Sequence, residues 1–305
     1  MKPLYMWAGG KNKMIPQYLE TPGIPTTGYD TYVEPFFGGG AMMVWAAQNC
    51  PDIKRFILND VNTEIVGIYI AIKYDLDNFI KRMDDLSVQY LPLDKAARKK
   101  FYYALRDDYT QNYHNWNSTY DSATLYFLMK TAFNGIWQTT KTSNGRFATP
   151  CGLLNQKDTV YDVDNVKQWH GFLQRVDITC GDWKKACSVV GSAFYFMDPP
   201  YRDSFTSYST VFDDAAHKDL IDYCKQQDAL GHYVFYCNRD AGDDFYKVNK
   251  GNLDIKYYNT KYTAGRRATE EDGTRTAKNA TEILLHSKNI TKTFGNGMFE
   301  EVDNT

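Results

Sequence analysis

Residues 31–60 place a strand, a glycine turn, a helix and a second strand in close succession, and this order restricts the possible folds most strongly. Residues 31–36 read as a short buried strand, Gly38-Gly39-Gly40 as a tight turn, and residues 41–47 as the start of a helix. Residues 55–60 predict a second strand that ends in Asp60. This is the outline of one half of a Rossmann-like α/β sheet.

The last third of the chain returns to the same α/β pattern. We expect strands at residues 192–197, 233–237, 256–258 and 281–286. A helix should begin at Asp213-Asp214, which can cap it, run to about residue 227 and close at Gly231.

The middle of the chain changes to a mainly helical pattern, with amphipathic stretches at residues 68–83, 94–109 and 123–134. The sequence therefore predicts one sheet split by an insert. Residues 1–65 and 177–292 would form one domain, residues 66–176 the inserted domain, and residues 293–305 a polar tail.

One hairpin is expected inside the insert. Residues 136–140 and 147–149 are β-prone and flank Ser143-Asn144-Gly145-Arg146. Asn-Gly between two such runs is a strong turn signal. Lys130, Lys141 and Arg146 would surround this hairpin with positive charge.

Composition sets few limits on the function. The 305 residues carry 35 Lys and Arg against 37 Asp and Glu, a net charge of −2. This balance argues against a generally basic surface but leaves room for a basic face. The six cysteines form no CxxC pair, so we expect reduced thiols and no metal site. We find no signal-peptide core and no apolar run of membrane-spanning length, and therefore expect a cytoplasmic protein.

The glycine turn can serve a ligand or only the fold. Its backbone N–H groups could approach a ligand, and the acid at the end of the next strand, Asp60, could accept ribose hydroxyls. Glu34 also fits the geometry of such a site. The turn contains Gly38 and Gly40 but lacks the G-x-G-x-x-G spacing that pyrophosphate needs. A ligand without phosphates would suit this shorter turn, and S-adenosyl-L-methionine is the leading candidate. A tight turn without a ligand remains the alternative.

Asp198-Pro199-Pro200-Tyr201 follows the very apolar residues 192–197. The two prolines end the sheet ladder, so the chain leaves the sheet rigidly. An amino group on a planar heterocycle is a poor nucleophile. Two acceptors, the Asp198 carboxylate and the Pro199 carbonyl, could hold its N–H groups while Tyr201 stacks on the ring. The alternative is a rigid turn with Asp198 as a helix cap.

These motifs together resemble the Dam-type family of DNA adenine-N6 methyltransferases, the D12 class within the alpha group of amino-methyltransferases. Trp7-Ala8-Gly9-Gly10-Lys11 resembles the N-terminal cofactor motif of that family. Residues 32–40, which include Glu34, Phe36, Gly38 and Gly40, resemble its F-V-E-P-F-x-G-x-G motif. Residues 57–62, the D-P-P-Y tetrapeptide, and Gly265-Arg266-Arg267 with Gly273-Thr274-Arg275 complete the match.

The resemblance implies a class I methyltransferase fold with seven mixed strands and an S-adenosylmethionine cofactor. It implies cofactor contacts at Trp7, Lys11, Asp60 and Asp198. Gly181-Asp182-Trp183 stands where related enzymes hold the cofactor's adenine, with a helix cap at Asp182 as the alternative.

The resemblance also implies double-stranded DNA as the partner, with the target adenine flipped out of the duplex. Phe133-Asn134-Gly135 resembles the start of the family's DNA-reading hairpin, with Phe133 as a wedge into the base stack. A core position on the preceding helix is the alternative for this ring. Phosphate contacts are expected from cations of the hairpin and the C-terminal segment, namely Lys130, Lys141, Arg146, Arg266, Arg267 and Arg275.

Two positions depart from the Dam enzymes that read GATC. Met6 stands where those enzymes carry Lys, and Gln138 stands where they carry Arg. Arg suits guanine O6 and N7, whereas Gln suits adenine N6 and N7. We therefore expect a changed or relaxed target, unless Lys141 or Arg146 supplies the missing contacts.

Other classes of protein stay open at this point. They are a methyltransferase acting on RNA or on a protein amide, a methyltransferase-like DNA-binding protein without activity, and a nicotinamide oxidoreductase. The short glycine turn disfavours the oxidoreductase, and the large insert favours duplex DNA.

Overall fold

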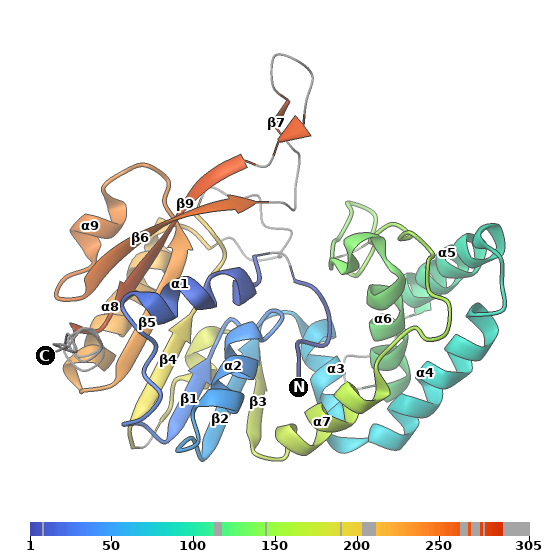
Figure 1. Ribbon diagram of the computed structural model, residues 1–305, viewed down its shortest axis with the longest axis horizontal. Coiled ribbons are helices and arrows are strands. Elements are labelled where there is room, and N and C mark those ends of the chain that lie inside the picture. Colours follow the sequence, from blue (N-terminus) through green and yellow to red (C-terminus); the bar gives the residue numbers. More distant parts are fainter. Residues whose placement is uncertain are drawn as a thin grey trace, which may run out of the picture.

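A seven-stranded mixed sheet forms the centre of the protein (Figure 1). The computed structural model describes residues 1–7, 9–112, 118–143, 145–189, 191–202, 212–262, 268–269, 275–276 and 278–288. The strand order is β3-β2-β1-β4-β5-β9-β6, and β9 runs antiparallel to both of its neighbours. The strands span Val176–Cys180 (β3), Arg55–Asp60 (β2), Thr31–Glu34 (β1), Ala193–Met197 (β4), Tyr233–Arg239 (β5), Lys278–His286 (β9) and Asp254–Tyr262 (β6). This topology confirms the predicted fold class.

Alternating side chains of the strands pack into two separate hydrophobic cores, because successive strand residues point to opposite faces of a sheet. In β4, Phe194 and Phe196 join the core on one face, and Tyr195 and Met197 join the core on the other. Both faces are apolar, as expected for parallel strands covered on both sides.

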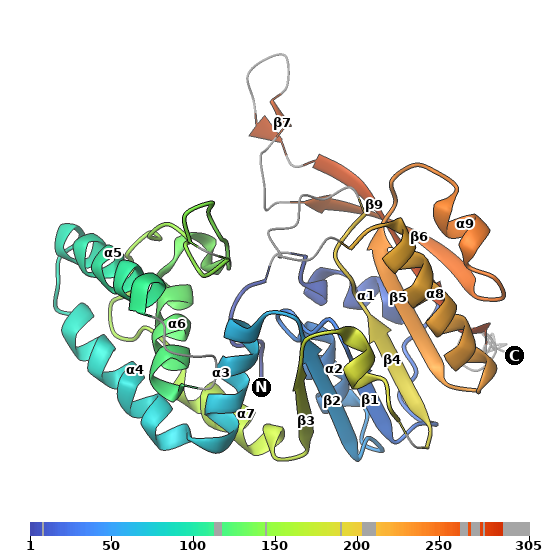
Figure 2. The ribbon, with the colours of Figure 1, turned by 180° about the vertical axis from the view of Figure 1, so that it is seen from behind.

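Helices cover each face of the sheet. α1 (Ile15–Glu20) and α2 (Ala41–Asn49) lie on the face turned toward the viewer in Figure 1. α8 (Asp214–Ala229) and α9 (Phe245–Asn249) lie on the opposite face, seen in Figure 2. Asp213 caps α8 by accepting a hydrogen bond from the Ala216 N–H, as its sequence predicts.

A group of helices stands beside the sheet at the β3 edge (Figures 1 and 2). It contains α3 (Thr63–Tyr74), α4 (Leu76–Tyr90), α5 (Lys95–Asn112), α6 (Thr119–Thr131) and α7 (Val163–Leu173). The predicted amphipathic stretch at residues 68–83 is two helices, because the backbone leaves helical geometry at Asp75. Edge-to-face contacts of Phe37 with Tyr69 of α3 and Trp169 of α7 join this group to the core of the sheet.

The prediction of a β-hairpin in the insert is wrong for the described residues. Residues 136–143 and 145–149 fold back on themselves but contain no strand. One backbone bond, from the Ala148 N–H to the Gln138 carbonyl at 2.7 Å, crosses between the two limbs. Side chains take the other positions: Thr149 Oγ1 accepts from the Gln138 N–H, and the Glu64 carboxylate accepts from the Phe147 N–H. A paired ladder is therefore not needed to hold this loop.

A small two-stranded sheet, β7 (Ala268–Thr269) with β8 (Arg275–Thr276), follows β6 beyond the edge of the main sheet. In the part of the chain that the structure describes, no helix is long and apolar enough to cross a membrane.

Candidate functional site

Three buried or partly buried carboxyl groups meet at one edge of the sheet. Glu34 and Asp60 end β1 and β2, and Asp198 directly follows β4. The strands are adjacent and parallel, so their carboxyl ends lie side by side. Ligands of α/β sheets bind at this edge, where the strand order changes direction. The topology thus brings together three of the acids that the sequence singled out.

The ammonium group of Lys11 joins this edge from the N-terminal segment. Its Nζ atom lies 2.7 Å from Asp198 Oδ1 and 3.8 Å from Glu282 Oε2, and it is only 3% exposed. Lys11 stands on η1 (Lys11–Lys13), a single 3₁₀ turn before α1. Its Nζ atom also donates to the Gly9 carbonyl and to the Tyr201 hydroxyl, each at 3.2 Å. One buried cation therefore holds two carboxylates and a phenol in place.

Burial and the partner's charge have opposite effects on the pKa values of Lys11 and Asp198. Burial raises the pKa of Asp198 to about 6, although the Lys11 ammonium acts to lower it. The neighbouring Glu282 charge raises the pKa of Asp198 further. For Lys11, burial alone would lower the pKa, but the Asp198 and Glu282 charges outweigh it and leave the pKa raised. Lys11 is thus charged at neutral pH, and Asp198 titrates close to neutrality.

Glu282, a residue that the sequence analysis missed, completes the cluster. It lies on β9, is buried, and accepts a 2.7 Å hydrogen bond from the Tyr201 hydroxyl. A signal was present in the sequence. Glu282, Leu284 and His286 are spaced two residues apart along a predicted strand, so they share one face, and Leu284 marks that face as buried. A charged residue there points to a paired or functional group.

A second set of contacts anchors the Asp-Pro-Pro-Tyr tetrapeptide. The buried Asn238 of β5 donates to the Pro200 carbonyl and accepts from the Arg202 N–H. The Arg202 guanidinium binds Asp214 and Asp243 and stacks over Phe245. Asp198 pairs with Lys11, and residues 199–202, which directly follow it, form no helix that it could cap. The helix-cap alternative for Asp198 is therefore wrong.

The glycine turn packs against the protein itself. Gly38, at φ +51°, lies so close to Trp7 that a Cβ atom would stand 2.6 Å from Trp7 Nε1. A Cβ atom at Gly40, at φ +65°, would stand even closer to the Phe37 ring. The Gly38 N–H donates to Asp60 Oδ2 at 2.8 Å, and Asn62 N–H donates to Asp60 Oδ1 at 2.9 Å. The turn thus orients the Asp60 carboxylate and also forms the surface against which Trp7 packs.

The predicted adenine-contacting residues lie farther along the same edge. Asp182 is exposed and caps η3 (Trp183–Ala186) by accepting from the Lys184 N–H. Trp183 is buried against Tyr223. Phe36 is half-buried and makes an edge-to-face contact with Phe212. The helix-cap role of Asp182 is present, and its cofactor role stays a prediction.

Comparison with known proteins decides the class. The family model of the D12 class N6 adenine-specific DNA methyltransferases matches residues 7–263. The chain belongs to this family. The type II methyltransferase M.MjaIII of Methanocaldococcus jannaschii is 30% identical over 294 residues, covering 93% of this chain and 98% of that protein. The retron Ec67 DNA adenine methylase of Escherichia coli is 26% identical and covers 94% and 92%.

A DNA adenine methylase of Haemophilus influenzae is 23% identical over 231 residues, covering 73% of this chain and 74% of that protein. The residues of this chain that match the family model include both the N-terminal motif at Trp7 and the tetrapeptide at Asp198. Membership of this family contradicts the alternative of a nicotinamide oxidoreductase.

The expected DNA-reading residues of the methyltransferase gather on the loop that follows α6. Phe133 starts η2 (Phe133–Gly135) and is 49% exposed, so the alternative of a core position is wrong. Asn134 adopts a left-handed backbone with φ +56°. Gln138 and Lys141 are exposed farther along the loop. Arg146 is half-buried, and its Nη1 atom donates to the Thr110 carbonyl of α5.

The two positions that depart from GATC-reading enzymes belong to neighbouring segments. Met6 is exposed, and a side chain at Gly135 would stand 3.7 Å from the Met6 Cβ atom. Gln138 lies three residues after Gly135. The methyltransferase thus places the Met6 segment beside the start of the loop that carries Gln138.

The remaining predicted DNA contacts are placed only in part. Lys130 lies at the end of α6, where burial lowers its pKa. Arg266 and Arg267 lie outside the described residues. The backbone of Arg275 forms β8, and its side chain is not described.

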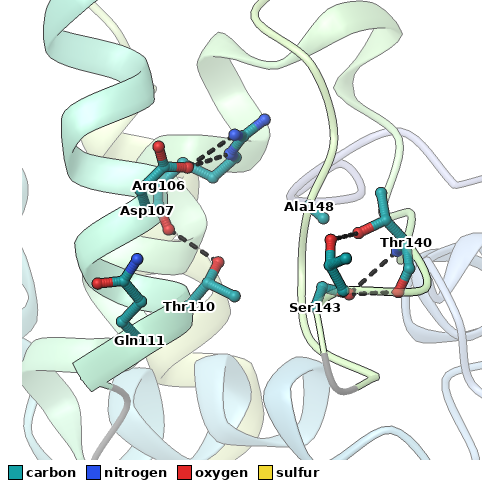
Figure 3. A pocket seen from close by; sticks show the side chains of 8 residues that line it. Arg106, Asp107, Thr110, Gln111, Thr140, Ser143 and Ala148 are labelled. Carbon is teal, nitrogen blue, oxygen red and sulfur yellow. Dashed lines mark hydrogen bonds and ion pairs between the residues drawn. The ribbon is translucent and has the colours of Figure 1, made fainter.

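A polar cavity of about 400 Å³ separates this loop from α5 (Figure 3). Arg106, Asp107, Thr110 and Gln111 line it from α5, facing loop residues that include Thr140 and Ser143. Arg106 pairs with Asp107. The lining includes the hydroxyl groups of Thr110, Thr140, Thr142 and Ser143, so the cavity can exchange hydrogen bonds with water or with a polar ligand.

Proposed function

We propose that this protein transfers a methyl group from S-adenosylmethionine to N6 of an adenine that is flipped out of duplex DNA. The family supports the reaction class, and the Lys11–Asp198–Tyr201–Glu282 cluster at the carboxyl edge of the sheet carries the proposal. The helices α4 to α6 and the loop at residues 132–151 would recognise the target, and the sheet domain would hold the cofactor.

The residues of the sheet edge suit a cationic ligand that carries ribose hydroxyls. Among the described residues, Glu34 and Asp60 take part in no ion pair, and burial raises the pKa of both above their usual values. A bound cation would favour their ionised forms. Each Asp60 oxygen accepts a backbone N–H, and the carboxylate keeps lone pairs for a hydroxyl donor.

When bound, S-adenosylmethionine supplies a methyl group on a positively charged sulfur. We assign its binding to residues around the glycine turn and the strand ends: Trp7, Lys11, Glu34, Phe36, Gly38, Gly40, Asp60, Asp182, Trp183 and Asp198. Trp7 and the glycine turn form one packed unit, which supports a preorganised wall beside Asp60.

The tetrapeptide would hold the adenine amino group. The Asp198 carboxylate and the Pro199 carbonyl accept its two N–H groups and aim the nitrogen at the methyl group. Pro200 keeps the segment rigid, and Tyr201 offers its ring as a stacking surface. Methyl transfer leaves an extra proton on the nitrogen, and the Asp198 carboxylate can accept it. Lys11 keeps Asp198 in position through the 2.7 Å ion pair.

Target reading would use Phe133, Asn134 and Gln138, with phosphate contacts from Lys130, Lys141, Arg146, Arg266, Arg267 and Arg275. The exposure of Phe133 supports its role as the wedge that opens the base stack. We propose a target that is changed or relaxed relative to GATC, because Met6 and Gln138 replace the basic residues of GATC-reading enzymes.

The test is a methyl-transfer assay with S-adenosylmethionine and four acceptors: unmethylated duplex DNA, single-stranded DNA, RNA and an unrelated protein. We expect N6-methyladenine in the digested duplex DNA. A methylation map of that DNA would then give the target. Product on RNA or protein alone would overturn the proposal, and DNA binding without product would favour an inactive binder. A map with GATC as the sole modified sequence would refute the changed target.

A further inference from the structure

Glu64 is a buried acid that the proposed reaction does not use. It lies in the first turn of α3, four residues after Asp60. The Asn62 side chain caps this helix by accepting from the Glu64 and Ile65 N–H groups, while the Asn62 N–H donates to Asp60. A short chain of hydrogen bonds therefore fixes Glu64 relative to the acid at the end of β2.

The Glu64 carboxylate binds the loop at residues 136–149. Its Oε2 atom accepts from Trp137 Nε1 and from the Phe147 N–H, each at 3.2 Å. Its Oε1 atom accepts from the Tyr109 hydroxyl of α5 at 2.7 Å. Trp137 and Phe147 belong to the outgoing and returning limbs of the loop. One carboxylate thus joins both limbs and the neighbouring helix.

The rest of the loop rests on α5. The Tyr102 hydroxyl donates to the Thr149 carbonyl, Thr110 Oγ1 donates to the Phe147 carbonyl, and Arg146 donates to the Thr110 carbonyl. These bonds hold the loop to α5, beside the cavity of Figure 3. The bonds of Glu64 also hold it to the start of α3, which directly follows the Asp60 segment. Gln138, which we expect to read a base, directly follows the tethered Trp137.

We propose that Glu64 is a positioning residue for target choice: it fixes the base-reading loop relative to the sheet edge that carries Asp60. This inference rests on the proposed function, because it takes the loop as the part that reads DNA. A loop released from Glu64 would still lie on α5, but Gln138 would no longer hold one position over the target base. Discrimination between sequences would therefore fall before the methyl-transfer chemistry fails.

Two substitutions separate the tether from the bulk of the side chain. Glu64→Leu keeps the volume but leaves the Trp137 and Phe147 N–H groups without their acceptor. Glu64→Gln can keep both bonds if its amide nitrogen turns to the Tyr109 hydroxyl, which can accept as well as donate. Trp137→Phe removes one donor and leaves Glu64 in place. Glu20→Gln, at an exposed position of α1, is the control.

The readout is kcat/KM on the duplex that the wild type methylates, and on duplexes in which one base pair of that target is replaced. For Glu64→Leu we expect the preference for the true target to fall about tenfold or more, the size of one lost base contact. The loss should be in KM for DNA, with affinity for S-adenosylmethionine unchanged. Trp137→Phe should show a smaller loss, and Glu64→Gln and Glu20→Gln should stay close to wild type.

An equal fall on true and altered targets, in step with the folded fraction, would assign Glu64 a structural role only and overturn the proposal. Hydrogen exchange of the Phe147 amide gives a second test that needs no activity. Exchange should accelerate in Glu64→Leu and not in Glu64→Gln, and unchanged exchange would show that no tether exists. If the wild type makes no N6-methyladenine, the proposed function fails, and the exchange result still decides whether Glu64 holds the loop.

Discussion

The Lys11 ammonium lies 2.7 Å from the Asp198 carboxylate, although the two residues are far apart in the sequence. The pair joins the N-terminal segment to the tetrapeptide after β4. Glu282 of β9 adds a second negative group to the same cation. The charge balance of this cluster controls when Asp198 is ionised, and it can be tested by titration.

Activity should follow the ionisation of Asp198. Only the carboxylate can accept two hydrogen bonds without donating one, and burial raises the pKa of Asp198 to about 6. Because the pKa is raised, the active form is present above about pH 6 and is lost as the pH falls. We expect kcat/KM to drop about tenfold per pH unit below that point. A profile that is flat between pH 5 and 8 would contradict this assignment.

Lys11→Met should move this acid limb to higher pH. The Lys11 charge lowers the pKa of Asp198, so its removal lets burial and Glu282 raise that pKa further. Breaking a buried ion pair also costs about 3–5 kcal/mol of unfolding free energy. Activity profiles and urea unfolding would measure both effects, with Lys13→Met on the same 3₁₀ turn as the control. An unmoved limb in a folded Lys11→Met protein would refute the coupling.

Glu282→Gln should move the limb in the opposite direction. The Glu282 charge raises the pKa of Asp198, so a neutral amide should let Asp198 ionise at lower pH. The amide oxygen can still accept from the Tyr201 hydroxyl, which keeps the ring in place. The pH profile of single-turnover methylation measures the shift, with Glu20→Gln as the control. A shift toward higher pH would show that Glu282 acts in another way.

His217 should make the fold sensitive to acid. Its imidazole is buried 2.7 Å from the Tyr236 hydroxyl, and burial together with Arg202 lowers its pKa to about 4. In the unfolded chain this imidazole binds a proton near pH 6.5, whereas in the folded chain it stays neutral down to about pH 4. The contribution of His217 to the free energy of unfolding is therefore complete above pH 6.5 and falls as the pH drops toward 4. The loss is about 3 kcal/mol at 1.36 kcal/mol per pKa unit. His217→Gln should flatten this part of the stability curve, and parallel curves would contradict the assignment.

The strand ends were predictable from sequence because their signals are local. The apolar run at residues 55–60 and its final acid predict both β2 and the position of Asp60. The same holds for β4 and Asp198. Parallel strands place these acids at one edge whatever the sequence between them, so the meeting of Glu34, Asp60 and Asp198 follows from topology.

The partners of these acids could not be predicted in the same way. Glu282 reaches Tyr201 because β9 inserts antiparallel between β5 and β6, a pairing between distant segments. The Asn-Gly turn signal indicated a hairpin, but Glu64 and Thr149 side chains supply the acceptors that a ladder would have supplied. Sequence patterns report strand propensity and turn geometry, and they do not report which distant side chain satisfies a backbone N–H.

The most direct test of the methyl-transfer site is the single-turnover rate of N6-methyladenine formation by wild type, Asp198→Asn and Asp158→Asn. Asp158 is exposed and lies outside the cluster, so its variant controls for the loss of one acid. We predict that Asp158→Asn matches wild type, and that Asp198→Asn is slower by at least about a hundredfold while it remains folded and still binds S-adenosylmethionine. An Asp198→Asn protein that methylates duplex DNA at the wild-type rate would contradict the assignment of this cluster as the site of methyl transfer.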